Sequence, residues 1–286
     1  MTRGRTSIVI PSRLEKYLIP TIHDVLHQAV GDVEVIVILD GWWPQEALPD
    51  DTRVHYLHWG APKGLRPSLN AAVDMATGEF LLKLDSHVAV CKGFDGLLKA
   101  ACGESDVVVP AKRSLDPATW TMHKHPWWYY WLAWPWHPEN PHVGLIERNY
   151  GPTFNAKHRE PAVDDILTFQ GSAWMLRRSW WEKILPEGMN AERYYWAQEA
   201  VEIGLSSWLA GGRCRIVKAA EYGHLWKGSG ENKRTFQRHQ PEWDAAMLRS
   251  VKFWFAQKGF GALIDKFSPL PTWPEDWRDQ VRWELP

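Results

Sequence analysis

The stretch Leu69-Asn-Ala-Ala-Val-Asp-Met-Ala-Thr-Gly-Glu-Phe-Leu-Leu-Lys-Leu-Asp-Ser-His87 contains the pattern that decides the fold. In its first half the apolar residues recur at helical spacing, and Gly78 is expected to stop that helix. Residues 80–84 then form an apolar run that is typical of a buried strand and that ends at Asp85. A helix that leads into a buried strand is the repeating unit of a parallel α/β sheet.

The same alternation extends toward the N-terminus. Residues 7–10 and 34–39 predict buried strands, and the helical spacing of apolar residues from 22 to 29 predicts a helix between them. Residues 107–109 predict a further strand. We therefore expect an α/β fold with a mostly parallel sheet flanked by helices, in which ligands bind beyond the carboxyl ends of the strands.

The second half of the chain is less regular. Residues 112–165, which are rich in Pro, His and Trp, are expected to be mostly loop and short helix. Strands are predicted at 168–176 and 215–219, with a helix between them that Gly211 and Gly212 stop, and a helical tail follows. This pattern predicts a nucleotide-binding half (1–110), an acceptor-binding and catalytic half of the same domain (111–225), and a lid loop with a C-terminal helical extension (226–286).

Composition excludes several classes of protein. The formal net charge of -1 excludes binding of polyanions by bulk charge alone. No run approaches the roughly 18 apolar residues that a membrane span needs, and Pro11 interrupts the first apolar run too early for a signal peptide. Three cysteines without a C-x-x-C spacing argue against a disulfide framework and a zinc ribbon, so a cytoplasmic location is expected.

The 20 Trp, against 8 Tyr and 9 Phe, supply an unusual amount of flat amphipathic surface.

Asp85 and His87 are the strongest candidate for a metal site. They are two residues apart at the end of a predicted strand, and a period of two places both side chains on one face. A carboxylate and an imidazole suit Mn²⁺ or a similar divalent ion. The alternative is that Asp85 caps the next segment and His87 is a half-buried polar residue.

Other polar residues fall at the same predicted edge. Asp40 ends the second strand, although an Asp-Gly turn explains it equally well. Residues 64–70 open a helix with a glycine and with Arg66 near its positive end, which suits an anion. There is no G-x-G-x-x-G and no G-x-x-x-x-G-K, so dinucleotide and P-loop sites lack their signatures.

Two further segments combine small and acidic residues. Gly171 and Ser172 interrupt a strand pattern, as happens where a ligand approaches the backbone, with a plain β-bulge as the alternative. Glu199 and Glu202 open an amphipathic helix. Glu199 is either catalytic or a partner of the helix dipole.

Taken together, seven segments resemble the nucleotide-sugar glycosyltransferases of the GT-A (Rossmann-like) fold, family 2 in particular, and the second half resembles the polypeptide N-acetylgalactosaminyltransferases. The resemblance covers about residues 6–235, in the expected order. The segments are Ser7-Ile-Val-Ile-Pro-Ser-Arg13, Val35-Ile-Val-Ile-Leu-Asp-Gly41, Lys83-Leu-Asp-Ser-His87, Gln170-Gly-Ser-Ala173, Trp196-Ala-Gln-Glu-Ala-Val-Glu202, Trp208-Leu-Ala-Gly-Gly212 and Gly223-His-Leu-Trp226.

The resemblance implies a role for each matching position. Pro11, Ser12 and Arg13 would line the base and ribose of a uridine-type nucleotide, with Asp40 bonded to the base. Asp85 and His87 would be the D-x-H form of the family's metal motif, and His224 the third ligand. Gly171 and Ser172 would form the floor between donor sugar and acceptor, and Glu199 would face the reacting sugar.

The implied chemistry is the transfer of a sugar from a nucleoside diphosphate sugar, with Mn²⁺ as the expected metal and Mg²⁺ as the alternative. The metal neutralises the charge that develops on the leaving diphosphate, and Arg66 and Lys227 are placed to assist. In an inverting enzyme Glu199 would be the general base, and a retaining enzyme would use it differently. The N-acetylgalactosaminyl enzymes have W-G-G-E-N where this chain has Trp196-Ala-Gln-Glu-Ala200. Those enzymes also carry a lectin domain, and the resemblance does not lead us to expect one here.

Two other functions remain open at this point. A nucleotidyltransferase also uses a metal and a doubly wound sheet, but it would need a glycine-rich basic loop after the first strand, and residues 11–16 offer none. A non-enzymatic carbohydrate-binding module would use the Trp platforms but needs no acids at strand ends.

The acceptor is expected to bind where positive charge alternates with aromatic surface, at residues 112–136. A glycan, a peptide Ser/Thr hydroxyl and a hydroxymethylated base of viral DNA all fit. We expect an acceptor wall formed by Trp127, Trp128, Trp131 and Trp136, and a lid over the donor at residues 225–240, where two glycines precede Lys233 and Arg234.

Overall fold

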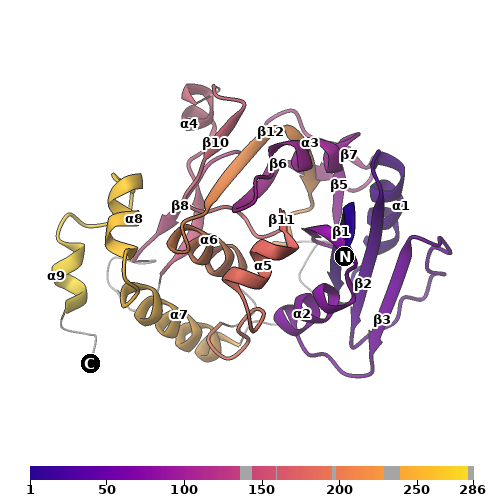
Figure 1. Cartoon of the computed structure of the whole chain (residues 1–286), viewed down its shortest axis with the longest axis horizontal. Coiled ribbons are helices and arrows are strands. Elements are labelled where there is room, and N and C mark those ends of the chain that lie inside the picture. The colour runs from indigo at the N-terminus through magenta and orange to yellow at the C-terminus, as the bar shows by residue number, and fades with distance from the viewer. Residues whose placement is uncertain (136–143, 159, 195–197, 229–238, 283–286) are drawn as a thin grey trace.

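A mixed β-sheet crosses the middle of the molecule in Figure 1, a computed structural model that describes residues 1–135, 144–158, 160–194, 198–228 and 239–282. The strand order in this sheet is β10-β12-β6-β11-β4-β1-β2-β3, and β5 and β7 pair with β12 and β6 off this path. A separate two-stranded sheet joins β8 to β9. The predicted α/β class with a flanked, largely parallel sheet is confirmed.

The parallel half of the sheet contains β1 (Thr2–Ser12), β2 (Val33–Asp40), β3 (Val54–Trp59) and β4 (Gly78–Leu84). The helices between these strands are α1 (Leu18–Gln28) and α2 (Leu65–Met75). Strand β1 pairs in parallel with both β2 and β4, and β2 pairs in parallel with β3. The expected β-α-β unit is therefore present, and its strands all end at one edge.

The other half of the sheet mixes directions. It contains β5 (Val88–Val90), β6 (Asp106–Asp116), β7 (Thr121–Met122), β10 (Val163–Asp165), β11 (Ala173–Arg177) and β12 (Arg213–His224). Strand β11 runs antiparallel between β4 and β6, while β6 and β12 are parallel to each other. As a result the end of β12 meets β5, which directly follows the turn after β4.

The remaining elements surround this sheet. They are α3 (Phe94–Ala101), β8 (Tyr130–Ala133), β9 (Ile146–Asn149), α4 (Pro152–Lys157), α5 (Arg178–Ile184), α6 (Glu199–Leu209), α7 (Gln240–Phe255), α8 (Phe260–Phe267) and α9 (Trp277–Arg282). Helix α6 ends where Gly211 adopts a positive φ of 85°, as the sequence predicted.

Alternate residues of the central strands pack into cores on opposite faces of the sheet. Ile8 and Ile10 of β1 pack with α1 and α3 on one face. Val9 packs with α2, α5 and α6 on the other. A further core joins α6 to the C-terminal helices and to the β8–β9 hairpin, so the helical tail is packed against residues of α6 and of this hairpin.

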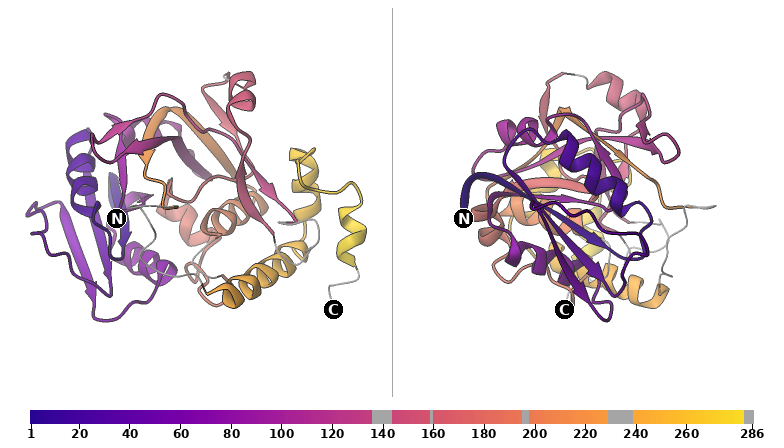
Figure 2. Two further views of the ribbon diagram at one scale, coloured as in Figure 1. Left: turned by 180° about the vertical axis from the view of Figure 1, so that it is seen from behind. Right: turned by 90° about the vertical axis from the view of Figure 1, so that its right-hand side faces the viewer.

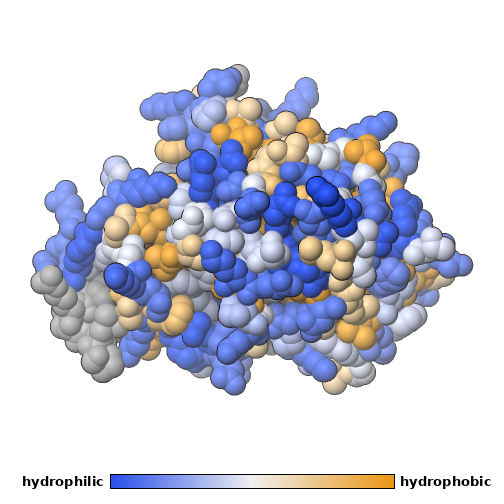
Figure 3. Space-filling model, viewed as in Figure 1, coloured by the Kyte–Doolittle hydropathy of each residue, from blue (hydrophilic) through white to orange (hydrophobic). Residues whose placement is uncertain are grey.

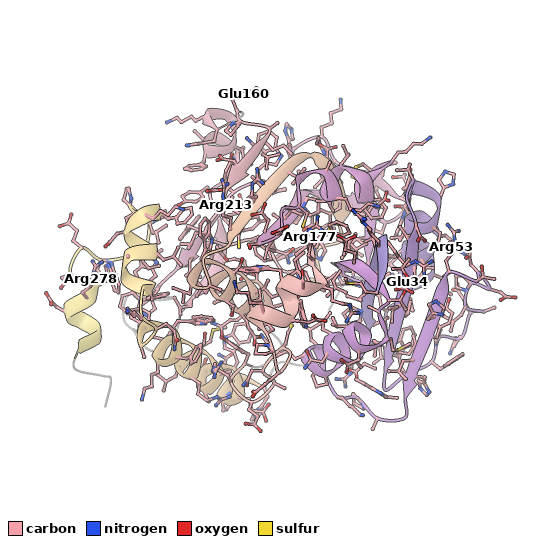
Figure 4. The ribbon with its side chains drawn as sticks, in the orientation of Figure 1. Glu34, Arg53, Glu160, Arg177, Arg213 and Arg278 are labelled. Carbon is pink, nitrogen blue, oxygen red and sulfur yellow. The ribbon has the colours of Figure 1, made fainter. Side chains whose placement is uncertain are left out.

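The C-terminal helices α7, α8 and α9 gather at one end of the molecule, and α1, β2 and β3 lie at the other (Figures 1 and 2). Arg278 of α9 pairs with Asp265 of α8 at 2.5 Å, close to the outer tip of that end (Figure 4). On the face in Figure 3, hydrophobic side chains form separate small patches among hydrophilic ones. Among the residues that the structure describes, no helix is both long enough and apolar enough to span a membrane.

Two expectations about local structure were wrong. Helix α2 ends before Gly78, which instead opens β4, and a Cβ there would lie 2.7 Å from the Arg5 carbonyl oxygen. Strand β11 begins only at Ala173, and Thr168 makes just an isolated bridge with Tyr130. The described part of residues 112–165 contains the expected loops and the short helix α4, but β6 extends to Asp116 and short strands follow it that were not predicted. The pairings of β8 with β9 and of β10 with β12 join separate segments of the chain, which local periodicity does not report.

Candidate active site

Asp85, His87 and His224 converge at the carboxyl end of β4. Their candidate ligand atoms, one from each residue, all lie within 4.8 Å of one another. Asp85 Oδ2 is 3.1 Å from His224 Nε2 and 3.7 Å from His87 Nε2. The two imidazole rings are 4.9 Å apart. The structure thus brings together the three residues that the sequence analysis assigned to the metal.

Strand pairing and a turn produce this convergence. Residues 85–87 form a turn between β4 and β5, so Asp85 and His87 share a side through that turn and not through the alternation of a strand. Antiparallel pairing of β12 with β5 places His224 opposite Val88. The backbone N–H of Leu225 also donates to the carbonyl oxygen of His87 at 3.2 Å, which fixes the two histidines beside each other.

The donor set fits a divalent transition metal. One carboxylate and two imidazoles are the mixed oxygen and nitrogen ligands that Mn²⁺ accepts. Burial lowers the pKa of His224 to about 4, which keeps its ring neutral as ligation requires. Burial alone would raise the pKa of Asp85, but Lys83 and the two histidines hold that pKa well below its usual value, so the carboxylate is charged.

Glu15 lies behind His87 and was not anticipated from the sequence. Its Oε2 is 3.1 Å from His87 Nδ1, on the ring nitrogen that does not face Asp85. Lys227 Nζ lies 2.8 Å from the same oxygen, so this predicted donor-site lysine contacts Glu15. Burial would raise the pKa of Glu15, but His87 and Lys227 lower it below its ordinary value. Such a carboxylate fixes the orientation of a ligating imidazole.

Lys83 connects Asp85 of this candidate metal site to Glu199 and was likewise missed. Its side chain is only 1% exposed, and its Nζ lies 2.6 Å from Asp85 Oδ1 and 3.2 Å from Glu199 Oε2. Burial would lower the pKa of Lys83, but the two carboxylates raise it above its usual value. The lysine is therefore a buried cation between two acids.

Glu199 stands at the first turn of α6 and is almost fully buried. Its Oε1 accepts a hydrogen bond from Trp174 Nε1, and its Oε2 faces Lys83. Burial raises the pKa of Glu199, and the charge of Lys83 opposes that rise. Both oxygens of the predicted catalytic carboxylate are thus already engaged.

Gly171 and Ser172 lie in the turn before β11, beside this lysine. The Gly171 carbonyl oxygen accepts a hydrogen bond from Lys83 Nζ at 2.7 Å. The Ser172 carbonyl oxygen accepts one from the Asp85 backbone N–H at 2.9 Å, and the Ser172 hydroxyl contacts Tyr222. The turn therefore fixes the backbone of the cluster.

The predicted nucleoside residues lie at the end of β1 and β2. Ser12 is buried, Pro11 is half-buried and Arg13 is exposed. The carbonyl oxygen of Ser12 accepts a hydrogen bond from Trp42 Nε1 at 2.9 Å. Asp40 is buried and accepts hydrogen bonds from the backbone N–H groups of residues 63 and 64, a loop-anchoring role that the sequence analysis did not anticipate.

Arg66 is placed differently from the expectation of an open anion site. It is 2% exposed, and its Nε lies 2.9 Å from Glu202 Oε2. Its guanidinium also lies over the ring of Tyr194 at 4.7 Å. The pair joins α2 to α6, a partnership that only the tertiary structure reveals.

The predicted acceptor wall and lid are only partly covered by the structure. Trp127, Trp128 and Trp131 are each half-buried, while Trp136 lies outside the described residues. Most of the expected lid, including Lys233 and Arg234, also lies outside them. Trp226, which follows the cluster in the chain, is 65% exposed, and the Lys112 ammonium lies 5.6 Å from its ring.

The fold and this cluster at the strand ends define the class as glycosyltransferases of the GT-A fold. The model of glycosyl transferase family 2 matches residues 7–185, which is more than half of the chain, and the chain belongs to that family.

Curated relatives agree with this assignment. The chain is 25% identical over 259 residues to "Putative polypeptide N-acetylgalactosaminyltransferase 13" of Drosophila melanogaster, covering 78% of this chain and 42% of the relative. It is 23% identical over 246 residues to "Polypeptide N-acetylgalactosaminyltransferase 5" of Caenorhabditis elegans, covering 78% of this chain and 37% of the relative. The chain thus spans less than half the length of these relatives.

A solved structure shares the fold. "Crystal structure of GalNAc-T7 with UDP, GalNAc and Mn2+" superposes with a TM-score of 0.68 and 16% identity, covering 98% of this chain and 54% of that chain. At this identity the likeness concerns the fold.

Proposed function

We propose that this chain transfers a sugar from a nucleoside diphosphate sugar, in the first place a UDP sugar, to an acceptor hydroxyl. The observation that carries the proposal is the Asp85, His87 and His224 cluster at the strand ends of a family 2 domain. The GalNAc-T7 structure, which holds UDP and Mn²⁺ in the same fold, supports the choice of donor and metal.

Asp85, His87 and His224 would hold a divalent metal, Mn²⁺ first and Mg²⁺ as the alternative. When bound, the ion supplies neutralising charge for the phosphate oxygens of the donor. Glu15 orients His87, and Lys83 keeps Asp85 charged.

The remaining predicted residues take supporting positions. Pro11, Ser12 and Arg13 would line the nucleoside, with Asp40 holding the loop beside it. Gly171 and Ser172 would form the floor under the sugar, and Glu199 would face that sugar from α6. Lys227 would lie near the diphosphate, where it is held by its ion pair with Glu15. Arg66 would hold α6 in place through its ion pair with Glu202.

The acceptor is proposed to meet the side formed by residues 111–225, with the nucleotide on residues 1–110 and a lid within 226–286. The relatives are named for polypeptide acceptors, which favours a Ser or Thr hydroxyl for the first trial. A glycan and a hydroxymethylated base of viral DNA are the next acceptors to be tried. The cytoplasmic location stays a prediction.

The proposal is tested by measuring UDP release from a panel of UDP sugars with Mn²⁺, with Mg²⁺ and with excess EDTA. We expect metal-dependent release, and we expect His87→Ala and His224→Ala to weaken Mn²⁺ binding in calorimetry while unfolding cooperatively. The same panel is then offered to peptide, glycan and hydroxymethylated DNA acceptors. Full activity in excess EDTA contradicts the metal site, and failure to bind any UDP sugar contradicts the donor.

A further inference from the structure

Glu199 is a poorly placed proton acceptor for the transfer reaction. Its Oε1 accepts a hydrogen bond from Trp174 Nε1, its Oε2 lies 3.2 Å from Lys83 Nζ, and its side chain is 6% exposed. A general base must accept a hydrogen bond from the hydroxyl that it deprotonates. Each oxygen of Glu199 has a second lone pair, but its nearly complete burial restricts access to that lone pair, and the charge of Lys83 opposes protonation.

A second carboxylate, Glu147 on β9, has an unused oxygen. Its side chain is partly exposed, but its Oε2 is shielded from solvent and has no hydrogen-bond partner in the described part of the chain. A buried acceptor without a partner is costly, and it is rare unless a ligand or water satisfies it. Glu147 Oε2 can therefore accept a hydrogen bond from a bound ligand.

The β8–β9 hairpin turns Glu147 and Tyr130 to the same side. Glu147 pairs with Leu132, and Tyr130, two residues before Leu132, pairs with Asn149. The hydroxyl of Tyr130 is buried on this side, and Asn149 acts on it from β9.

The side chain of Gln198 fixes this hairpin to the start of α6. Gln198, which precedes Glu199, donates from Nε2 to the carbonyl oxygens of Gly144 and Leu145 at 3.1 and 2.9 Å. Gln198 and Leu145 both adopt positive φ, 61° and 54°, which is strained for residues other than glycine. Such strain clusters where a fold holds functional groups in place, and here it holds β9 against the helix that carries Glu199.

Charges facing Glu147 come from each neighbouring element. Lys112 approaches from β6, Glu199 from α6 and Arg148 from β9 itself, and Tyr130 faces it from β8. The charges of both Glu147 and Asp85 act on Lys112. Burial raises the pKa of Glu147 to about 7 and lowers that of Lys112 to about 8. A base with a pKa near the working pH is well matched to its task.

We propose that Glu147, and not Glu199, is the general base that takes the proton of the acceptor hydroxyl. This inference rests on the proposed function. The acceptor oxygen forms a bond to the anomeric carbon of the donor sugar, the bond from that carbon to the diphosphate breaks, and its electron pair leaves with the diphosphate. The hydroxyl proton passes to Glu147 Oε2. Glu199 is then a positioning residue that holds Lys83 and the sugar.

The test uses UDP release from UDP sugars with Mn²⁺, first with water as acceptor. Glu147→Gln and Glu147→Ala are expected to lower the rate at least a hundredfold, with unchanged UDP binding in calorimetry and cooperative unfolding. Glu187→Gln, the same exchange at an exposed position, is the matched control and keeps the wild-type rate. Azide needs no deprotonation, so it is expected to restore UDP release in Glu147→Ala, with a glycosyl azide as product.

The pH profile separates the two carboxylates. The wild-type rate requires ionised Glu147, so the rate is expected to rise with pH through a midpoint near 7. Glu147→Gln is expected to lose this rising limb of the pH–rate profile. Glu199→Gln is expected to keep the limb while raising the donor KM. The inference is overturned if Glu147→Gln releases UDP at the wild-type rate, if azide restores nothing, or if the limb follows Glu199. A wild-type protein that releases no UDP from any donor would overturn the proposed function itself.

Discussion

Glu15 and His87 face each other at 3.1 Å across the loops that follow β1 and β4, with the carboxylate on the imidazole nitrogen turned away from Asp85. Lys227, in the segment after β12, forms an ion pair with the same carboxylate at 2.8 Å. Three loops that are distant in sequence thus set the orientation of one candidate metal ligand. If these residues hold a metal, the contact predicts that Glu15 affects metal affinity without contacting the metal.

Replacing Glu15 with Gln should therefore weaken metal binding. Loss of such a partner typically lowers metal affinity by about 10- to 100-fold, because the imidazole is less basic and less fixed. Titration calorimetry with Mn²⁺ measures the change, and Glu187→Gln again provides the control. If the Mn²⁺ affinity is unchanged in a folded Glu15→Gln protein, Glu15 does not support the metal site and serves only as the ion-pair partner of Lys227.

Lys83 should be essential for stability. Lys83→Met leaves the carboxylates of Asp85 and Glu199 without their shared cation, and removing one partner of a buried pair costs about 3–5 kcal/mol. The free energy of unfolding in urea reports this loss. Adding Glu199→Gln to Lys83→Met should recover part of it, because one unpaired charge is then removed. Strict additivity of the two substitutions would show that Lys83 and Glu199 do not interact.

Arg66 offers a test of two roles. The buried ion pair with Glu202 predicts that Arg66→Met lowers the free energy of unfolding by about 3–5 kcal/mol. A phosphate-binding role instead predicts a raised donor KM in a protein of normal stability. Urea unfolding and donor titration on the same preparation decide between them, and normal stability would return Arg66 to the anion site suggested by its position near the start of α2.

Much of the fold follows from local pattern. The apolar runs of β1, β2 and β4 and the helical spacing of α1 and α2 are set by neighbouring residues, so the parallel half of the sheet was predictable. Asp85 and His87 were proposed from their spacing and His224 from the resemblance, and the pairing of β12 with β5 brings the three together.

The missed features depend on contacts across the chain. Glu15, Lys83 and Glu147 have no local motif, because each acquires its role from a partner on another element. A lysine inside an apolar strand was the one visible signal, since a buried ammonium needs an acid beside it. The β8–β9 hairpin was missed for the same reason, because its strands are four residues each and are defined by their mutual pairing.

The aromatic wall can be tested once the acceptor screen has provided a substrate. Trp127 pairs through its backbone with Lys112. Trp131 pairs with Arg148, on the face of the β8–β9 pair opposite Glu147, and packs against Tyr150 with ring centroids 4.9 Å apart. Both rings are half-buried and keep some exposed surface for the predicted wall. Replacing either with Ala should raise the acceptor KM by about 3- to 10-fold, as expected from a lost aromatic contact of about 0.5–1.5 kcal/mol, and should leave the donor KM unchanged. Trp43, which is 58% exposed on the loop after β2, is the matched Trp→Ala control and should not alter acceptor use. Initial-rate measurements with each substrate varied in turn separate these effects. If Trp127→Ala and Trp131→Ala instead lower thermal stability and leave the acceptor KM unchanged, the two rings belong to the hydrophobic core and the acceptor binds elsewhere.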